Sequence, residues 1–406
     1  VAAAADDTDM FRGGPLHTGV YTGSAPPLDA RVKWRFPTGG RIISSPAIMD
    51  GTVYFGSFDG DLYAVNETSG TLKWKFETQG PITSSPAVID GTVLFGSYDG
   101  NFYAVDAASG REKWHFATGG ERRFEAKHIH GIDPPAETMP DFWDFYLSSP
   151  VVDGGFVYFG SGDGNVYKLN VASGVKVWSF ATGDVVHSSP ALFNNRVYVG
   201  SFDKYFYAID ASTGELKWRY KTGEDPMIHN QEGITSSPAI SDGIVYFGCR
   251  NATIYALDAG SGALKWSQKG NRGWVSVSPA VNDGKVYVAT GSDMALKELD
   301  AKTGQVLYSR KIGAGTFASP AVVGNLVILA TFDGKLRAID PAKDAETILL
   351  PAPPLVPIAL ASNFYDDHVA GMMARLKEGA FLSSPVVHNG VVFVGHTDGS
   401  MIALGQ

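Results

Sequence analysis

The stretch SSPAIMDGTVYFGSFDGDLYAVNETSGTLKWKF, residues 44–76, decides the fold of this chain. It contains four short apolar, β-branched and aromatic runs, at 46–48, 52–56, 62–65 and 72–76. Turn signals separate these runs: Asp50-Gly51, Asp59-Gly60 and the loop 66–70, where glycine supplies the positive φ that tight turns need. The pattern predicts four antiparallel strands joined by hairpins.

Ser-Pro openings like the one in this stretch recur eight times along the chain. Their prolines are Pro46, Pro86, Pro150, Pro190, Pro238, Pro279, Pro320 and Pro385, at intervals of 40, 64, 40, 48, 41, 41 and 65 residues. A period of about 40 residues with four strands per unit is typical of propeller blades. We therefore predict an all-β fold, an eight-bladed β-propeller of four-stranded antiparallel blades.

Most units end on the pattern Ala-x-Asp/Asn-x-x-Thr/Ser-Gly-x-x-x-Trp, which places a tryptophan on the outermost strand. These tryptophans are Trp74, Trp114, Trp178, Trp218 and Trp266, and the sixth unit has Tyr308 instead. Such a ring can cover the edge of its blade and pack on the next blade. The eighth unit ends on its third strand, at 400–404, so we expect residues 32–36, which include Trp34, to supply the fourth strand and close the ring.

The repeats resemble those of the pyrroloquinoline quinone (PQQ) dehydrogenases and of the outer-membrane assembly lipoprotein family BamB. The resemblance covers residues 32–406, and the segment 11–19 is similar to the lead-in of many PQQ-like repeat proteins, so we expect a lead-in at 1–31 followed by a single propeller. It implies either a PQQ-dependent alcohol or sugar dehydrogenase or a non-catalytic scaffold for protein assembly. The vicinal disulfide that contacts the quinone in those enzymes cannot form here, because Cys249 is the single cysteine, and this argues against bound PQQ.

The composition of the chain limits the classes of partner that it can bind. The net charge of −9 argues against nucleic acid and anionic membrane surfaces, and no stretch of about 18 apolar residues predicts a membrane span. The start VAAAADD resembles the residues around a signal-peptidase cut, which predicts a periplasmic or secreted protein whose signal has been removed.

Three of the intervals are long, and their extra residues fall at 119–147, 223–235 and 341–382. Each insertion joins the outer strand of one blade to the inner strand of the next, and such loops all emerge on one face of a propeller. We expect the insertions to build a pocket for a polar small molecule over the central channel. Alternatively, they cap the channel or form a contact with a protein partner or subunit.

The first insertion contains His128 and His130, which project to the same side if the segment is extended. That is the geometry of two ligands of one divalent metal ion, so we take both as candidate metal ligands. Solvated loop histidines would give the same pattern.

Other polar residues near the same face suggest a catalytic site. The catalytic candidates are His187, His229, His130, Tyr365, Asp366 and Asp367, and the ligand-binding candidates are Arg122, Arg123, Asn230, Gln231, Arg250, Arg272, Trp274 and His396. Histidine can act as a general base, tyrosine as an acid and arginine as a stabiliser of negative charge, while paired aspartates suit glycoside cleavage. We therefore expect a saccharide or glycoside lyase or hydrolase, with a BamB-like scaffold and a PQQ dehydrogenase as the alternatives.

Overall fold

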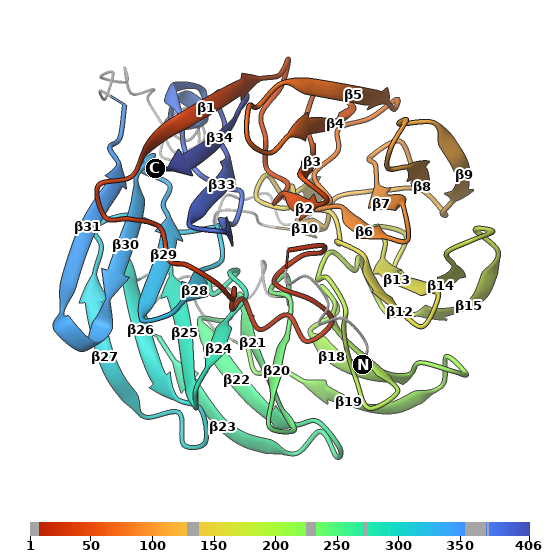
Figure 1. The fold of residues 1–406 in the computed structure, drawn as a ribbon. Coiled ribbons are helices and arrows are strands. Elements are labelled where there is room, and N and C mark those ends of the chain that lie inside the picture. Colours follow the sequence, from red (N-terminus) through yellow and green to blue (C-terminus); the bar gives the residue numbers. More distant parts are fainter. Residues whose placement is uncertain are drawn as a thin grey trace.

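The computed structural model describes residues 8–127, 138–224, 233–270, 274–291, 293–353, 371 and 373–406. In these residues eight four-stranded antiparallel sheets stand around a central axis, as predicted (Figure 1). No helix in the described part of the chain is long and apolar enough to cross a membrane.

Blades 1 to 4 follow the chain in order, and a two-stranded sheet lies between blades 2 and 3. Blade 1 is β2 (Ala47–Met49), β3 (Thr52–Gly56), β4 (Asp61–Asn66) and β5 (Leu72–Glu77); blade 2 is β6 (Ala87–Ile89), β7 (Thr92–Gly96), β8 (Asn101–Asp106) and β9 (Glu112–Ala117). The small sheet is β10 (Glu125–Lys127) and β11 (Thr138–Pro140). Blade 3 is β12 (Val151–Asp153), β13 (Phe156–Gly160), β14 (Asn165–Asn170) and β15 (Lys176–Ala181); blade 4 is β16 (Ala191–Phe193), β17 (Arg196–Gly200), β18 (Tyr205–Asp210) and β19 (Leu216–Lys221).

Blades 5 to 8 complete the ring. Blade 5 is β20 (Ala239–Ser241), β21 (Ile244–Cys249), β22 (Thr253–Asp258) and β23 (Leu264–Lys269); blade 6 is β24 (Ala280–Asn282), β25 (Lys285–Thr290), β26 (Ala295–Asp300) and β27 (Val306–Lys311). Blade 7 is β28 (Ala321–Val323), β29 (Leu326–Ala330), β30 (Leu336–Asp340), the 3-10 turn η2 (Pro341–Lys343) and β31 (Ala345–Leu350); blade 8 is β32 (Val386–His388), β33 (Val391–Gly395), β34 (Ser400–Gly405) and β1 (Arg31–Pro37). Residues 373–378 form a short helix.

The strand sequences match their places in the blades. The second and third strands are buried on both faces and read as continuous apolar runs, such as Thr52–Gly56 in β3. Most outer strands alternate between exposed residues and buried or half-buried ones, and Leu72–Glu77 in β5 carries lysines at exposed positions. Charged outer edges oppose pairing with other chains, so the sequence protects the rim of the ring.

The ring closes through the N-terminal strand. β1 pairs with β34 in antiparallel register, with Val32 opposite Leu404 and Phe36 opposite Met401. The prediction that residues 32–36 supply the missing fourth strand is therefore confirmed.

Tryptophans on the outer strands join neighbouring blades. The indole N–H of Trp74 in blade 1 donates to the carbonyl of Ala107 in blade 2 at 2.9 Å, and its ring packs on Gly110. A Cβ at Gly110 would lie 2.7 Å from that ring, and φ there is +69°, so both space and backbone conformation require glycine. The same donation to the next blade is made by Trp34, Trp114, Trp178, Trp218 and Trp266.

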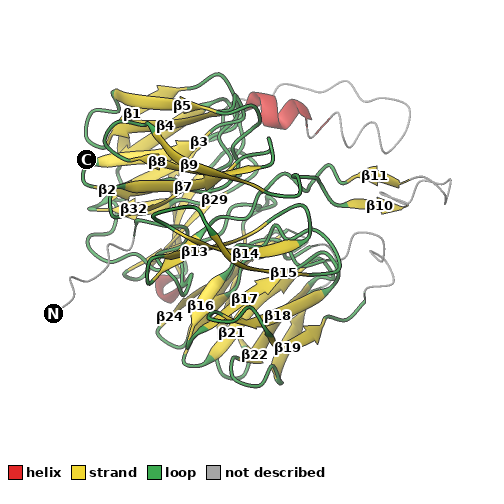
Figure 2. Cartoon of the chain, turned by 90° about the vertical axis from the view of Figure 1, so that its right-hand side faces the viewer, coloured by secondary structure: helices red, strands yellow, loops and turns green. Residues whose placement is uncertain are grey.

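The two faces of the ring differ. The small sheet β10–β11 and the helix at 373–378 lie on one face, and the described part of the lead-in crosses the other (Figures 1 and 2). We call the first of these the insertion face.

Candidate functional site

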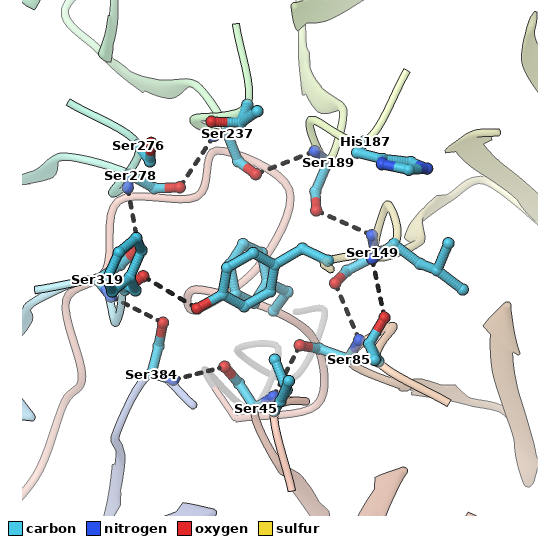
Figure 3. A pocket seen from close by; sticks show the side chains of 17 residues that line it. Ser45, Ser85, Ser149, His187, Ser189, Ser237, Ser276, Ser278, Ser319 and Ser384 are labelled. Carbon is cyan, nitrogen blue, oxygen red and sulfur yellow. Dashed lines mark hydrogen bonds between the residues drawn. The ribbon is translucent and has the colours of Figure 1, made fainter. Parts of the chain in front are cut away.

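The second serine of each opening contributes to a closed ring of hydrogen bonds around the channel (Figure 3). The backbone N–H of Ser45 donates to Ser85 Oγ at 2.9 Å, and the N–H of Ser85 donates to Ser149 Oγ at 3.0 Å. The contact continues through Ser189, Ser237, Ser278, Ser319 and Ser384, whose N–H returns to Ser45. The ring anchors each blade to both neighbours and satisfies the buried backbone where the inner strands begin.

The lead-in closes the channel on the face opposite the insertions. Its carbonyls at 8, 9, 15, 16, 18 and 19 accept backbone N–H groups from six different innermost strands. The guanidinium of Arg12 donates to the carbonyls of Pro279 and Pro320, and burial lowers its pKa to about 10. Burial, reinforced by the charge of Arg12, lowers the pKa of His17 to about 3, so this histidine is neutral.

The first insertion covers the other end of the channel with aromatic residues. The ring of Trp143 stacks on Phe317 at a centroid distance of 4.7 Å, and the hydroxyl of Tyr146 donates to the carbonyl of Leu382 at 2.8 Å. The cavity between the two closures, lined by Phe11 and Tyr146 among others, measures about 40 Å³. Typical small-molecule pockets measure roughly 300–1,000 Å³, so the described part of this insertion caps the channel.

His187 is held by two carboxylates of the first insertion. Its Nδ1 lies 2.7 Å from Asp144 Oδ1, its Nε2 lies 3.5 Å from Glu121 Oε2, and its side chain is only 1% exposed. Burial lowers the pKa of His187, but the two carboxylates outweigh burial and raise it to about 9. Both acids are further anchored, because Asp144 accepts the N–H of Phe124 at 2.6 Å and Glu121 accepts the hydroxyl of Ser161 at 2.7 Å.

Arg250 forms a second buried ion pair with the same insertion. Its Nη1 contacts Asp141 Oδ2, and both side chains are at most 2% exposed. The guanidinium also packs over Trp274 at 4.4 Å and Phe202 at 4.9 Å from the ring centroids, which adds cation–π attraction in a dry environment. The arginine and the tryptophan predicted to bind a ligand are therefore in contact with each other.

The other described candidates contact residues outside these two ion pairs. Arg122 is half exposed and donates to Asp184 at 2.9 Å. Arg123 lies beside the buried hydroxyl of Tyr98, whose pKa is raised by burial and partly lowered by the charge of Arg123. His396 is buried, with Nδ1 2.9 Å from Asp398 Oδ1. Burial raises the pKa of Asp398, but the hydrogen bond and charge of His396 outweigh it and lower that pKa to about 2.

The remaining candidates fall outside the described residues. They are His128, His130, His229, Asn230, Gln231, Arg272, Tyr365, Asp366 and Asp367. The proposed His128–His130 metal site and the Tyr365–Asp367 catalytic group therefore stay predictions.

Neither cofactor suggested by the sequence finds a site among the described residues. Within that part of the chain no group of three or more His, Cys, Asp or Glu side chains has an arrangement that could hold a metal ion. Inside the channel, the described cavity of about 40 Å³ is too small for PQQ.

Three acidic residues are missing from the sequence-based site: Glu121, Asp141 and Asp144. They bind the two cations that the sequence did single out, His187 and Arg250. The sequence did contain a signal, since Asp141 and Asp144 are each followed by two aromatic residues in the run DFWDFY. Carboxylates in such an apolar run are buried when the run is buried, and a buried carboxylate requires a cation or several donors.

Comparisons with known proteins identify the family of this chain. A family model described as outer membrane protein assembly factor BamB matches residues 27–128, 128–249 and 228–347. The protein of that name from Burkholderia pseudomallei (strain K96243) is 28% identical over 134 residues, which is 33% of this chain and 28% of that protein. This chain therefore aligns with less than one third of that relative's length.

Solved structures share the fold at low identity. BamB from Moraxella catarrhalis has a TM-score of 0.69 at 16% identity and covers 93% of this chain and 100% of its own. Quinohemoprotein alcohol dehydrogenase from Comamonas testosteroni has a TM-score of 0.72 at 14% identity and covers 100% of this chain and 82% of its own. At these identities the likeness shows the propeller architecture alone.

Proposed function

This chain belongs to the family of outer membrane protein assembly factor BamB, and on that premise we propose that it is a non-catalytic scaffold that binds a protein partner. The name of the family suggests a partner from the assembly of outer membrane proteins, and hence a place outside the cytoplasm. The predicted scaffold alternative is better supported by the comparisons than the saccharide lyase or hydrolase.

One observation carries the proposal. His187 and Arg250, the best placed catalytic and ligand-binding candidates, are buried and paired with carboxylates of the same insertion. Residues in such pairs hold an insertion on the ring, whereas a general base or an anion-binding arginine has to reach its substrate. The insertion face then acts as a rigid platform whose outer surface makes the contacts.

A groove on this platform is suited to a polypeptide. It measures about 600 Å³ and lies between the loop after β1 and the helix at 373–378. Phe58 and Met373 give it apolar surface, while Arg41 and Lys377 give it positive charge. The carboxylate of Asp398, which also lines the groove, is engaged by His396. The combination favours a partner segment with apolar and acidic side chains.

Site-specific photo-crosslinking tests the proposal in the intact cell envelope. A benzoylphenylalanine at Met373, which is 39% exposed, should give a defined protein adduct. The same residue at Val175, which is 63% exposed on the outer rim, serves as the control and should give none. A result without adducts from Met373 or Phe58, together with turnover of a glycoside that His187→Ala abolishes, would overturn the scaffold and favour the enzyme.

A further inference from the structure

The outer-strand position that joins each blade to the next is occupied by an aromatic ring in seven of the eight blades. In blade 1 it is Trp74, opposite Ala64 of the third strand, and in blade 8 it is Trp34, opposite Ala403. In blade 6 it is Tyr308, whose hydroxyl donates to Asp344 at 2.8 Å. In blade 7 the residue at this position, opposite Ala338, is Thr347.

The missing ring leaves an open space. A crevice of about 320 Å³ is lined by Ala338 and Thr347 themselves, by Leu326 from the second strand, and by Leu28 from the lead-in. Leu28 is 53% exposed, so one of these apolar walls also faces the solvent. The crevice therefore lies where the structure of the other blades places an indole.

Blade 7 lacks the aromatic ring because its neighbour, blade 8, is the blade that closes the ring and is built from both ends of the chain. A docking tryptophan elsewhere contacts the loop between the third and fourth strands of the next blade, as Trp74 contacts Gly110. Blade 8 has no such loop, because its third strand is β34 and its fourth is β1. The lead-in residue Leu28 lines the crevice beside blade 7.

We propose that this crevice is a docking site for a tryptophan side chain presented by a partner protein. The chemistry follows from the equivalent positions, six of which hold an indole with its N–H donated to an oxygen acceptor. In the crevice the oxygen acceptor is the buried carboxylate of Asp340, which also accepts the backbone N–H of Lys343 and pairs with its ammonium group. Aromatic anchors in such pockets carry much of the binding energy of protein interfaces.

A second copy of this chain does not offer the required side chain. All eight tryptophans fall in the described residues, and each is buried or half-buried. The partner is therefore a different protein. None of the residues lining the crevice belongs to the groove on the insertion face, so the crevice can be tested independently of the proposed function.

Ligand-observed fluorine NMR on the full chain tests the site, with N-acetyl-5-fluorotryptophanamide as the probe. We expect one site per chain with a Kd on the order of 1 mM, since a single aromatic anchor has to offset the entropy of immobilising the free ligand. The matched leucine amide should compete at least about tenfold less well, because it lacks the ring and its N–H.

Two variants fill the crevice and one creates a copy of it. Thr347→Trp restores the docking residue, and Leu28→Trp fills the space from an exposed loop if the first variant does not fold; each should weaken probe binding at least about tenfold. Trp74→Thr makes a second empty position in a filled blade, so the folded variant should bind two probes per chain. Absence of binding to the wild type, or binding that Leu28→Trp and Thr347→Trp leave unchanged, would overturn the proposal.

Discussion

The blades and the first insertion are held together by different interactions. Six junctions between neighbouring blades are made by an indole ring and its neutral hydrogen bond, such as the contact from Trp178 to the carbonyl of Ala211 at 3.1 Å. By contrast, Arg310 of blade 6 pairs with Asp344 and Glu346 of blade 7. The insertion is attached to the ring by buried charges, Arg250 with Asp141 and His187 with Asp144. The indole contacts should therefore keep their strength over a wide pH range, whereas the attachment of the insertion should depend on protonation.

The largest effect is expected from breaking the ring itself. Deleting residues 1–36 removes β1, which exposes the edge of β34, and also removes the lead-in that bonds to six innermost strands. The truncated protein should lose most of its cooperative thermal transition, measured by calorimetry. Deleting residues 1–30 retains β1 and should cost clearly less, while equal melting of both truncations and the full chain would contradict the closure.

A smaller but still large effect is expected from one docking tryptophan. Trp178 is 8% exposed, and Trp178→Ala should cost about 3 to 5 kcal/mol in the free energy of unfolding because it leaves a cavity between blades 3 and 4. The matched control is Thr347→Ala, at the position where the aromatic ring is absent, and it should change stability by no more than about 0.5 kcal/mol. Equal costs in urea denaturation would mean that the tryptophans do not join the blades.

These ring contacts could be predicted because they are local and repeated. The Ser-Pro openings recur in all eight units, and the Asp-Gly turns and the spacing from Gly110 to Trp114 recur in most of them, so a single unit read in full gives the blade and its neighbours. The eight-bladed fold and the closing strand were confirmed for that reason. Thr347 breaks the pattern in the sequence as well, but the crevice beside it depends on Leu28, which lies far away in the chain.

The contacts of the insertion could not be predicted in the same way. His187 and Asp144 are 43 residues apart, Arg250 and Asp141 are 109 apart, and neither pair recurs in other units. The sequence singled out His187 and Arg250 as unusual residues of the insertion face. No repeated spacing in the sequence linked either of them to a carboxylate. For His187 and Arg250 it predicted catalytic and ligand-binding roles, whereas the structure shows both side chains in buried ion pairs.

Removing one member of the Arg250 pair tests how firmly charge holds the insertion. Arg250→Met leaves the carboxylate of Asp141 buried without its cation and should cost roughly 3 kcal/mol or more. The double variant Arg250→Met with Asp141→Leu should recover most of that loss. Arg122→Met, in a half-exposed pair with Asp184, is the control and should cost less than about 1 kcal/mol. A double variant as unstable as the single one would show that the guanidinium packing on Trp274, rather than charge, holds the insertion.

The pH dependence of stability gives the finest test of the comparison. The folded-state pKa of His187 is raised from 6.5 to about 9, so its ion pairs stabilise the protein fully below about pH 6.5, and that stabilisation is lost as the pH rises through about 9. At about 1.4 kcal/mol per pKa unit the contribution reaches at most roughly 3 kcal/mol. Relative to His187→Asn, the wild type should therefore lose stability between pH 6.5 and 9.5 in urea titrations. Trp178→Ala changes no titrating group, so its difference from the wild type should be the same at both pH values. A pH-independent difference between the wild type and His187→Asn would mean that the carboxylates do not hold a charged histidine, and the contrast between neutral indole contacts and a charge-attached insertion would fail.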